Sequence, residues 1–110
     1  MLKRGAARKV TVYLNEDTSG SEDFAYRQVL KFLLEQEVAG ATLLRPEEGF
    51  GNHHQLHGAT RKSFPIRIEF IDSPEVVDAI LPSLCEIASD GLIEMQDTTV
   101  VQAAKREDAL

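Results

Sequence analysis

The order in which two kinds of hydrophobic periodicity alternate along the chain constrains the fold more than any other feature. Alternating or short extended apolar segments predict strands over residues 9–15, 41–44, 66–71 and 92–101. Apolar residues at helical spacing predict amphipathic helices over residues 22–37 and 74–89. The order strand, helix, strand, strand, helix, strand predicts an α+β, ferredoxin-like βαββαβ domain, with both helices on one face of an antiparallel sheet.

Turn and cap residues mark the ends of the two predicted helices. Ser21 is placed to cap the first helix, and Gly40 stands where a left-handed C-terminal cap is expected. Ser73 and Pro74 start the second helix, because proline at the first helical position lacks only an amide hydrogen that would be unpaired anyway. Pro82 lies inside that helix and predicts a kink.

Length and composition fit one globular domain. The chain has 110 residues, of which 43% are hydrophobic and 27% charged. We expect a basic N-terminal tail over residues 1–8, the domain over residues 9–101 and a C-terminal tail over residues 102–110. The lone Cys85 sits in an apolar helical pattern, which predicts a buried small side chain rather than a nucleophile.

Charge and hydropathy exclude several function classes. The formal net charge of −6 argues against nucleic acid as a partner, because nucleic-acid binding depends on a basic surface. The apolar runs are short, and the basic start is not followed by the apolar segment of a secretory signal. A cytoplasmic location is therefore expected.

The sheet face that the helices leave open has a mixed composition. If the apolar side of each strand packs under the helices, the opposite side presents Thr11, Tyr13, Arg67, Glu69, Ile71, Glu94 and Gln96. Ion pairs between Arg67 and Glu69 or Glu94 of another copy would allow this face to be buried in an oligomer. The alternative is a simply solvated sheet face.

Residues 45–65 interrupt the pattern between the second and third strands. Loops longer than about 12 to 15 residues without structure of their own are uncommon in compact domains and are usually functional or disordered. We predict an anion or nucleotide site at the base of this loop. The candidate ligand-binding residues are Arg45, Gly49, Phe50, Gly51, Asn52, His57 and Arg61.

Each of these residue types suits an anion. Gly49, Gly51 and Asn52 can form a nest of backbone N–H groups, an arginine can neutralise a phosphate, and Phe50 offers a stacking face. The alternative is that the glycines only turn the chain, Phe50 packs on the sheet edge and the loop is solvated.

The histidines of the loop raise the question of a metal site. His53, His54 and His57, with Glu47 or Glu48, make up a possible ligand set, although adjacent histidines point apart in an extended loop. No nucleophile stands with a base at recognisable spacing, so neither an enzyme nor a cofactor is expected.

Three stretches of the chain carry a family resemblance: VTVYLNED, AGATLLRPEEGFGNHHQLH and PIRIEFIDSPEVVDAILPSLCEIASDGLIEMQDTTVV. Together they resemble the PII-like family known as domain of unknown function 190, over about residues 9–101. The resemblance implies a ferredoxin-like fold and a relation to PII signalling proteins. Those proteins are trimers that bind nucleotides in clefts between subunits and contact partners through a long T-loop after the second strand. Residues 45–65 correspond to the T-loop.

The pattern and the resemblance together predict a non-catalytic regulatory homotrimer. It would sense a small ligand, an adenine nucleotide or another anion, and present its loop to a protein partner, for which a membrane transporter is one candidate. The alternative is a metal-binding trimer resembling the divalent-cation-tolerance proteins, which would use the loop histidines.

Overall fold

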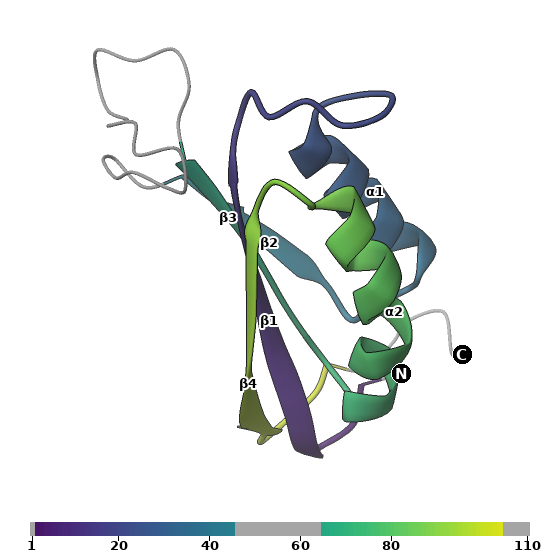
Figure 1. Cartoon of the computed structure of the whole chain (residues 1–110). Helices are drawn as coiled ribbons and strands as arrows, with labels where there is room; N and C mark the ends of the chain where they lie inside the picture. Colours follow the sequence, from purple (N-terminus) through teal and green to yellow (C-terminus); the bar gives the residue numbers. More distant parts are fainter. Residues whose placement is uncertain (1, 46–64, 105–110) are drawn as a thin grey trace.

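The computed structural model of the chain describes residues 2–45 and 65–104. The elements within these residues are β1 (Gly5–Asn15), α1 (Ala25–Glu35), β2 (Ala41–Leu44), β3 (Pro65–Asp72), α2 (Pro74–Ile87) and β4 (Leu92–Val100). The described strands form one antiparallel sheet in the order β2-β3-β1-β4, and α1 and α2 cover one of its faces (Figure 1). The predicted ferredoxin-like βαββαβ fold is confirmed.

The core lies between the sheet and the two helices. Val10 and Val12 of the central strand β1 are fully buried there. The other large buried side chains of this core are Leu14, Val29, Leu33, Ile66, Ile68, Phe70, Val77, Ile80 and Leu84. Burying a side chain of this size stabilises the fold by roughly 1.5 to 3 kcal/mol. Ile93 of β4 also packs against the core, whereas Met95 on the same face is half exposed.

The N-terminal tail is shorter than the residues 1–8 predicted from the sequence, because β1 begins at Gly5. Gly5–Arg8 pair with Asp97–Val100 of β4, and Ala7 is buried. The small residues before Arg8 carry no apolar alternation, which explains why the strand pattern appeared to start later. Arg8 forms ion pairs with Asp78 of α2 and with Asp97 of β4, the latter at 3.6 Å from Nε to Oδ1.

The first helix begins later than predicted, and Ser21 does not cap it. Phe24 occupies the N-cap position without a side-chain cap, and α1 starts at Ala25. The Ala25 amide donates to the Thr18 carbonyl at 2.8 Å, and Ser21 Oγ instead accepts from Gln28 Nε2 at 3.1 Å. The residues before α1 therefore form a turn closed by its own hydrogen bonds.

The left-handed residue that ends α1 is Glu37, directly after the C-cap Gln36, rather than the predicted Gly40. Glu37 has a φ of 57°, the left-handed conformation that glycine usually supplies. Its amide donates to the Leu34 carbonyl at 3.0 Å, and the Val38 amide donates to the Leu33 carbonyl at 3.3 Å. These two bonds form a Schellman motif, and Val38 packs against the core, so α1 ends at Glu35, five residues before the glycine.

Asp72 joins the two halves of the fold. Its carboxylate is buried and accepts from the Ser73 amide at 2.8 Å and from the Ala39 amide at 3.0 Å. Ser73 in turn accepts from the Val76 amide at 3.2 Å, and Pro74 is the first helical residue, as predicted. One carboxylate thus links the α1–β2 connection to the start of α2.

Two predictions on α2 had different outcomes. Pro82 lies inside the helix, as predicted, and is exposed; the kink itself stays a prediction. Cys85 is exposed, so the prediction that it is buried is wrong. The buried positions of α2 include Val77, Ile80 and Leu84, and Cys85 falls just beyond that stripe, on the solvent side.

We predict that Glu37→Gly stabilises the protein. A left-handed conformation costs a non-glycine residue roughly 1 to 2 kcal/mol, while glycine adds about 0.5 to 1 kcal/mol of unfolded-state entropy. The free energy of unfolding should therefore rise by about 0.5 to 1 kcal/mol, measured by urea denaturation. The matched control is Glu35→Gly, which places glycine in a right-handed turn of α1 and should lower stability. A loss of stability in Glu37→Gly would contradict the prediction.

Candidate functional site

Most of the predicted site lies outside the residues that the structure describes. This holds for Gly49, Phe50, Gly51, Asn52, His57 and Arg61, and also for His53 and His54. Of the predicted ligand-binding residues, the structure places Arg45, which directly follows β2. The described residues therefore define the two ends of the predicted T-loop, at Arg45 and at Pro65.

Arg45 forms an ion pair with Glu16, which directly follows β1. Both Nε and Nη2 of Arg45 donate to the same oxygen, Oε1 of Glu16, at 3.2 and 2.8 Å. The exposed fractions of the two side chains are 50% and 30%. Because β3 lies between β2 and β1 in the sheet, and Asn15 pairs with Pro65, the ion pair bridges the two strands that flank the start of β3.

A compact turn positions Glu16. The Thr18 amide donates to the Asn15 carbonyl at 3.1 Å, and the Gly20 amide donates to the Asp23 carbonyl at 2.8 Å. A Cβ on Gly20 would lie only 2.8 Å from that same carbonyl oxygen, so a larger residue would force the turn open. The turn between β1 and α1 lies at the end of the sheet where β2 ends (Figure 1). Glu16 is the first residue of this turn.

Sequence reasoning did not identify Glu16 as part of the site. The sequence does carry a signal for this contact. An acidic residue directly follows β1, a basic residue directly follows β2, and both positions lie at the same end of the predicted sheet. Arg45 was predicted to bind only an external anion, and no carboxylate of the chain itself was predicted as its partner.

Aromatic side chains at the start of α1 form a second feature at this end of the sheet. The rings of Phe24 and Tyr26 are stacked with centroids 6.2 Å apart. The Arg27 guanidinium lies 5.5 Å from the Phe24 centroid and 5.6 Å from the Tyr26 centroid. Asp23 lies 3.7 Å from that guanidinium. Arg27 Nε donates to the Tyr26 hydroxyl at 3.0 Å, and the Arg27 charge also interacts electrostatically with Glu16.

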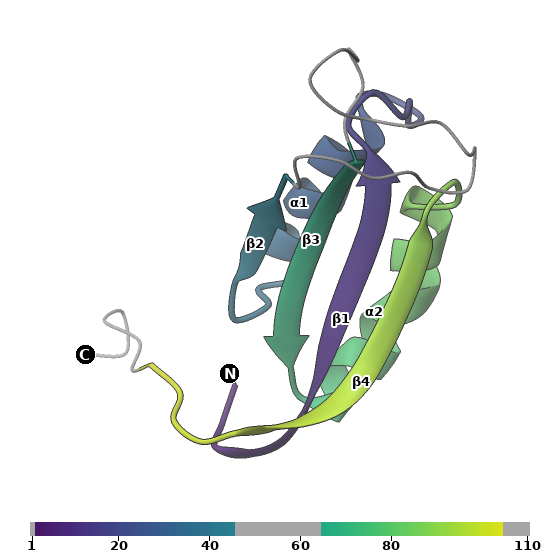
Figure 2. The ribbon, with the colours of Figure 1, turned by 90° about the vertical axis from the view of Figure 1, so that its left-hand side faces the viewer.

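The two helices leave the other face of the sheet open (Figure 2), and the polar side chains predicted for that face lie on it. Strand register and alternation place on it Thr11, Tyr13, Arg67, Glu69, Ile71, Glu94 and Gln96. The Tyr13 hydroxyl donates to Glu94 Oε1 at 2.6 Å. Arg67 was predicted to pair with a carboxylate of another copy. Its Nε lies 3.3 Å from Oε1 of Glu69 in its own chain.

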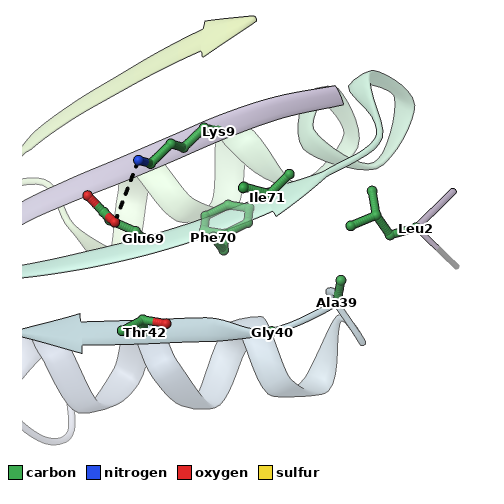
Figure 3. Close-up of a pocket in the computed structure, with 8 residues that line it drawn as sticks. All are labelled: Leu2, Lys9, Ala39, Gly40, Thr42, Glu69, Phe70 and Ile71. Atoms are coloured by element: carbon green, nitrogen blue, oxygen red, sulfur yellow. Dashed lines mark ion pairs between the residues drawn. The ribbon is translucent and has the colours of Figure 1, made fainter. Parts of the chain in front are cut away.

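A hollow lies at the opposite end of β2 from Arg45 (Figure 3). Its volume is about 320 Å³. The residues that line it are Leu2, Lys9, Ala39, Gly40, Thr42, Glu69, Phe70 and Ile71. Its cationic group, Lys9 Nζ, lies 3.8 Å from Glu69 Oε2, so the wall carries a balanced pair of charges. This hollow is separate from the predicted loop site, because Ala41 at the start of β2 pairs with Phe70 near the end of β3.

Within residues 2–45 and 65–104, no group of three or more histidine, cysteine, aspartate or glutamate residues is placed to hold a metal ion. Neither described helix is long and apolar enough to cross a membrane.

The chain is similar in sequence to known proteins. Residues 7–100 match the model of the DUF190 family, described as "Uncharacterized ACR". The UPF0166 protein MJ1524 of Methanocaldococcus jannaschii is 27% identical over 109 residues, which cover 92% of this chain and 97% of the relative.

Two solved structures of proteins with different described roles align with this chain. CPII, a nitrogen regulatory PII-like protein from Thiomonas intermedia bound to ADP, AMP and bicarbonate, aligns with a TM-score of 0.68 at 17% identity, over 93% of this chain and 94% of CPII. The divalent ion tolerance protein CutA1 from Ehrlichia chaffeensis aligns with a TM-score of 0.53 at 13% identity, over 92% and 86% of the respective chains. At these identities the likeness establishes the fold alone.

The hydrogen bond to Glu94 predicts a late titration of Tyr13. That bond is the largest cause that raises the pKa of Tyr13 above its ordinary value of 10.0, followed by desolvation and by the negative charge of Glu94. Because the folded pKa is the higher one, the stabilising contribution is complete below pH 10 and is lost as the pH rises through the folded pKa.

The titration is measured by tyrosine absorbance in a Tyr26→Phe background, which leaves Tyr13 as the one tyrosine of the chain. We expect its midpoint above pH 10, and a lower midpoint when Glu94→Gln is added. Glu86→Gln on α2 is the matched control and should leave the midpoint in place. A midpoint that Glu94→Gln does not move would contradict the assignment.

Proposed function

The chain belongs to the DUF190 family, and on this premise we propose that it is a non-catalytic regulatory protein that binds an anionic small molecule at the base of residues 45–65. The observation that carries the proposal is Arg45, held at the end of β2 where that segment begins. An adenine nucleotide is the first candidate ligand. The ADP, AMP and bicarbonate bound to CPII, which shares this fold, support both the ligand class and an anion site.

Arginine suits this role because its planar guanidinium offers a fork of donors. Two parallel N–H groups match two oxygens of a carboxylate or phosphate, and such charge-assisted hydrogen bonds are about twice as strong as neutral ones. In the proposed site, the amides of Gly49, Gly51 and Asn52 add donors and Phe50 stacks on the base. His57 and Arg61 complete the contacts.

We also propose that the protein acts as a homotrimer whose subunits meet through the open sheet face. Burying an unpaired charge is costly, whereas a paired and hydrogen-bonded one is tolerated. Tyr13 with Glu94, and Arg67 with Glu69, are already paired within one chain, so the face can approach another copy without leaving these charges unpaired. Residues 45–65 would then be presented to a protein partner, for which a membrane transporter is one candidate.

The second candidate function is metal binding, as in the divalent-cation-tolerance proteins. The fold likeness to CutA1 favours it, and the ligands would be His53, His54 and His57. Calorimetry with ADP and, separately, with zinc or copper separates the two functions. Heat of binding from a metal and none from ADP would replace the first proposal with the second.

Light scattering should give a particle of about three chain masses. Glu69→Lys should shift the particle toward smaller mass, because the substitution places three positive charges together on the open face, with Lys9 and Arg67. The matched control is Glu86→Lys, the same charge reversal on the exposed side of α2. A wild-type monomer at micromolar concentration would exclude the trimer, and an unchanged mass in Glu69→Lys would place the interface elsewhere.

Arg45→Gln should weaken ADP binding by about 10-fold or more, measured by calorimetry. Each hydrogen bond to a charged group contributes roughly 1.5 to 3 kcal/mol, and 1.4 kcal/mol corresponds to tenfold in affinity. Arg27→Gln is the matched control, because it removes an arginine at the same end of the sheet that the aromatic rings already engage. Equal losses in both variants would mean that only the general positive charge matters.

A further inference from the structure

The cation of the proposed anion site already has an anion of the same chain bound to it. Glu16 Oε1 accepts from both Nε and Nη2 of Arg45, at 3.2 and 2.8 Å. These two groups form the side edge of the guanidinium, which is one of its two edges that can receive a carboxylate or phosphate in paired contacts. A ligand oxygen and Glu16 Oε1 cannot occupy it together.

We infer that Glu16 is an internal competitor for the ligand at Arg45 and sets the affinity of the site. The inference rests on the proposed function and extends it to a residue outside residues 45–65. An anionic ligand binds the Nε and Nη2 edge of Arg45 only in molecules in which the Glu16 contact is open. The apparent affinity is therefore the intrinsic affinity multiplied by the open fraction.

The backbone presets this contact. Glu16 follows β1 directly, and the hydrogen bond from Thr18 to Asn15 closes the chain immediately around it. Arg45 follows β2 directly. Each of the two charged residues thus directly follows a strand of the same sheet. When the ion pair is open, the backbone still keeps the two side chains close to each other. Glu16 competes as a tethered group, at a concentration set by the fold rather than by the solution.

The Glu16–Arg45 ion pair is weak enough for a ligand to displace Glu16. Both side chains are partly exposed, and exposed ion pairs of this kind favour the closed form over the open form by about 1.4- to 5-fold. The competition then lowers ligand affinity by about two- to six-fold. The loss is the same for every anion that uses this edge, so a ligand with several further contacts still binds.

Competition by Glu16 should affect all anions that bind this edge equally. The closed fraction is a property of the free protein, so removing Glu16 raises the affinity of every anion that uses this edge by the same factor. ADP and inorganic phosphate differ greatly in their other contacts, and they should nevertheless gain equally.

The test is calorimetry with ADP and with inorganic phosphate on the wild type and on Glu16→Gln. We expect both ligands to bind about two- to six-fold more tightly to Glu16→Gln. Glu22→Gln is the matched control, because Glu22 lies in the same turn, is exposed and undergoes the same change of charge. Glu16→Ala, with circular dichroism to confirm folding, should reproduce the gain without the amide. In an Arg45→Gln background, Glu16→Gln should have no further effect.

The outcomes separate this inference from the proposed function. ADP binding that is equally tight in the wild type and in Glu16→Gln overturns the competition and leaves the proposed function in place. An equal gain in Glu22→Gln shows a general charge effect and also overturns it. If no variant and no wild-type sample binds either ligand, the proposed function fails and the competition fails with it.

Discussion

The two-sided pairing of β1 is the constraint on which the rest of the structure depends. β1 hydrogen-bonds to β3 on one edge and to β4 on the other, so its alternation decides the two faces of the whole sheet. Val10 and Val12 must point toward the helices, and Tyr13 then points to the open face. A shift of register by one residue would exchange these sets and bury the tyrosine. The core, the polar open face and the meeting of Glu16 with Arg45 all follow from this one strand.

Asp72 adds a second constraint, which acts between the two halves of the chain. The α1–β2 connection and the start of α2 are both tied to this one buried carboxylate. The same acidic residue therefore ends β3, precedes the cap of α2 and fixes the approach of β2 to the sheet edge. Through β2 it also contributes to the position of Arg45.

The sequence predicted the architecture well, because apolar alternation and helical spacing are strong signals in elements such as β3 and α2. The predictions were wrong at helix ends where another residue or turn took the place of the expected cap. Glu37 adopts the left-handed conformation that was expected of Gly40, and the closed turn before α1 takes the place of a cap by Ser21. Arg45 was predicted as a site residue, but its contact with Glu16 becomes apparent only when the predicted topology places the ends of β1 and β2 at the same end of the sheet. Gly49 to Arg61 lie outside the described residues, so that part of the site stays a prediction.

The sheet order has a consequence for synthesis on the ribosome. The central strand is the first to be made, whereas one of its two neighbours, β4, is the last, and the two are joined by pairs such as Val10 with Met95. Until residues 92–100 have emerged, one edge of β1 has no partner and the nascent sheet stays open there. Unpaired strand edges of this kind recruit other chains. The domain can therefore close only after β4 has emerged, and a chain truncated before β4 would be expected to aggregate rather than to form a smaller stable fold.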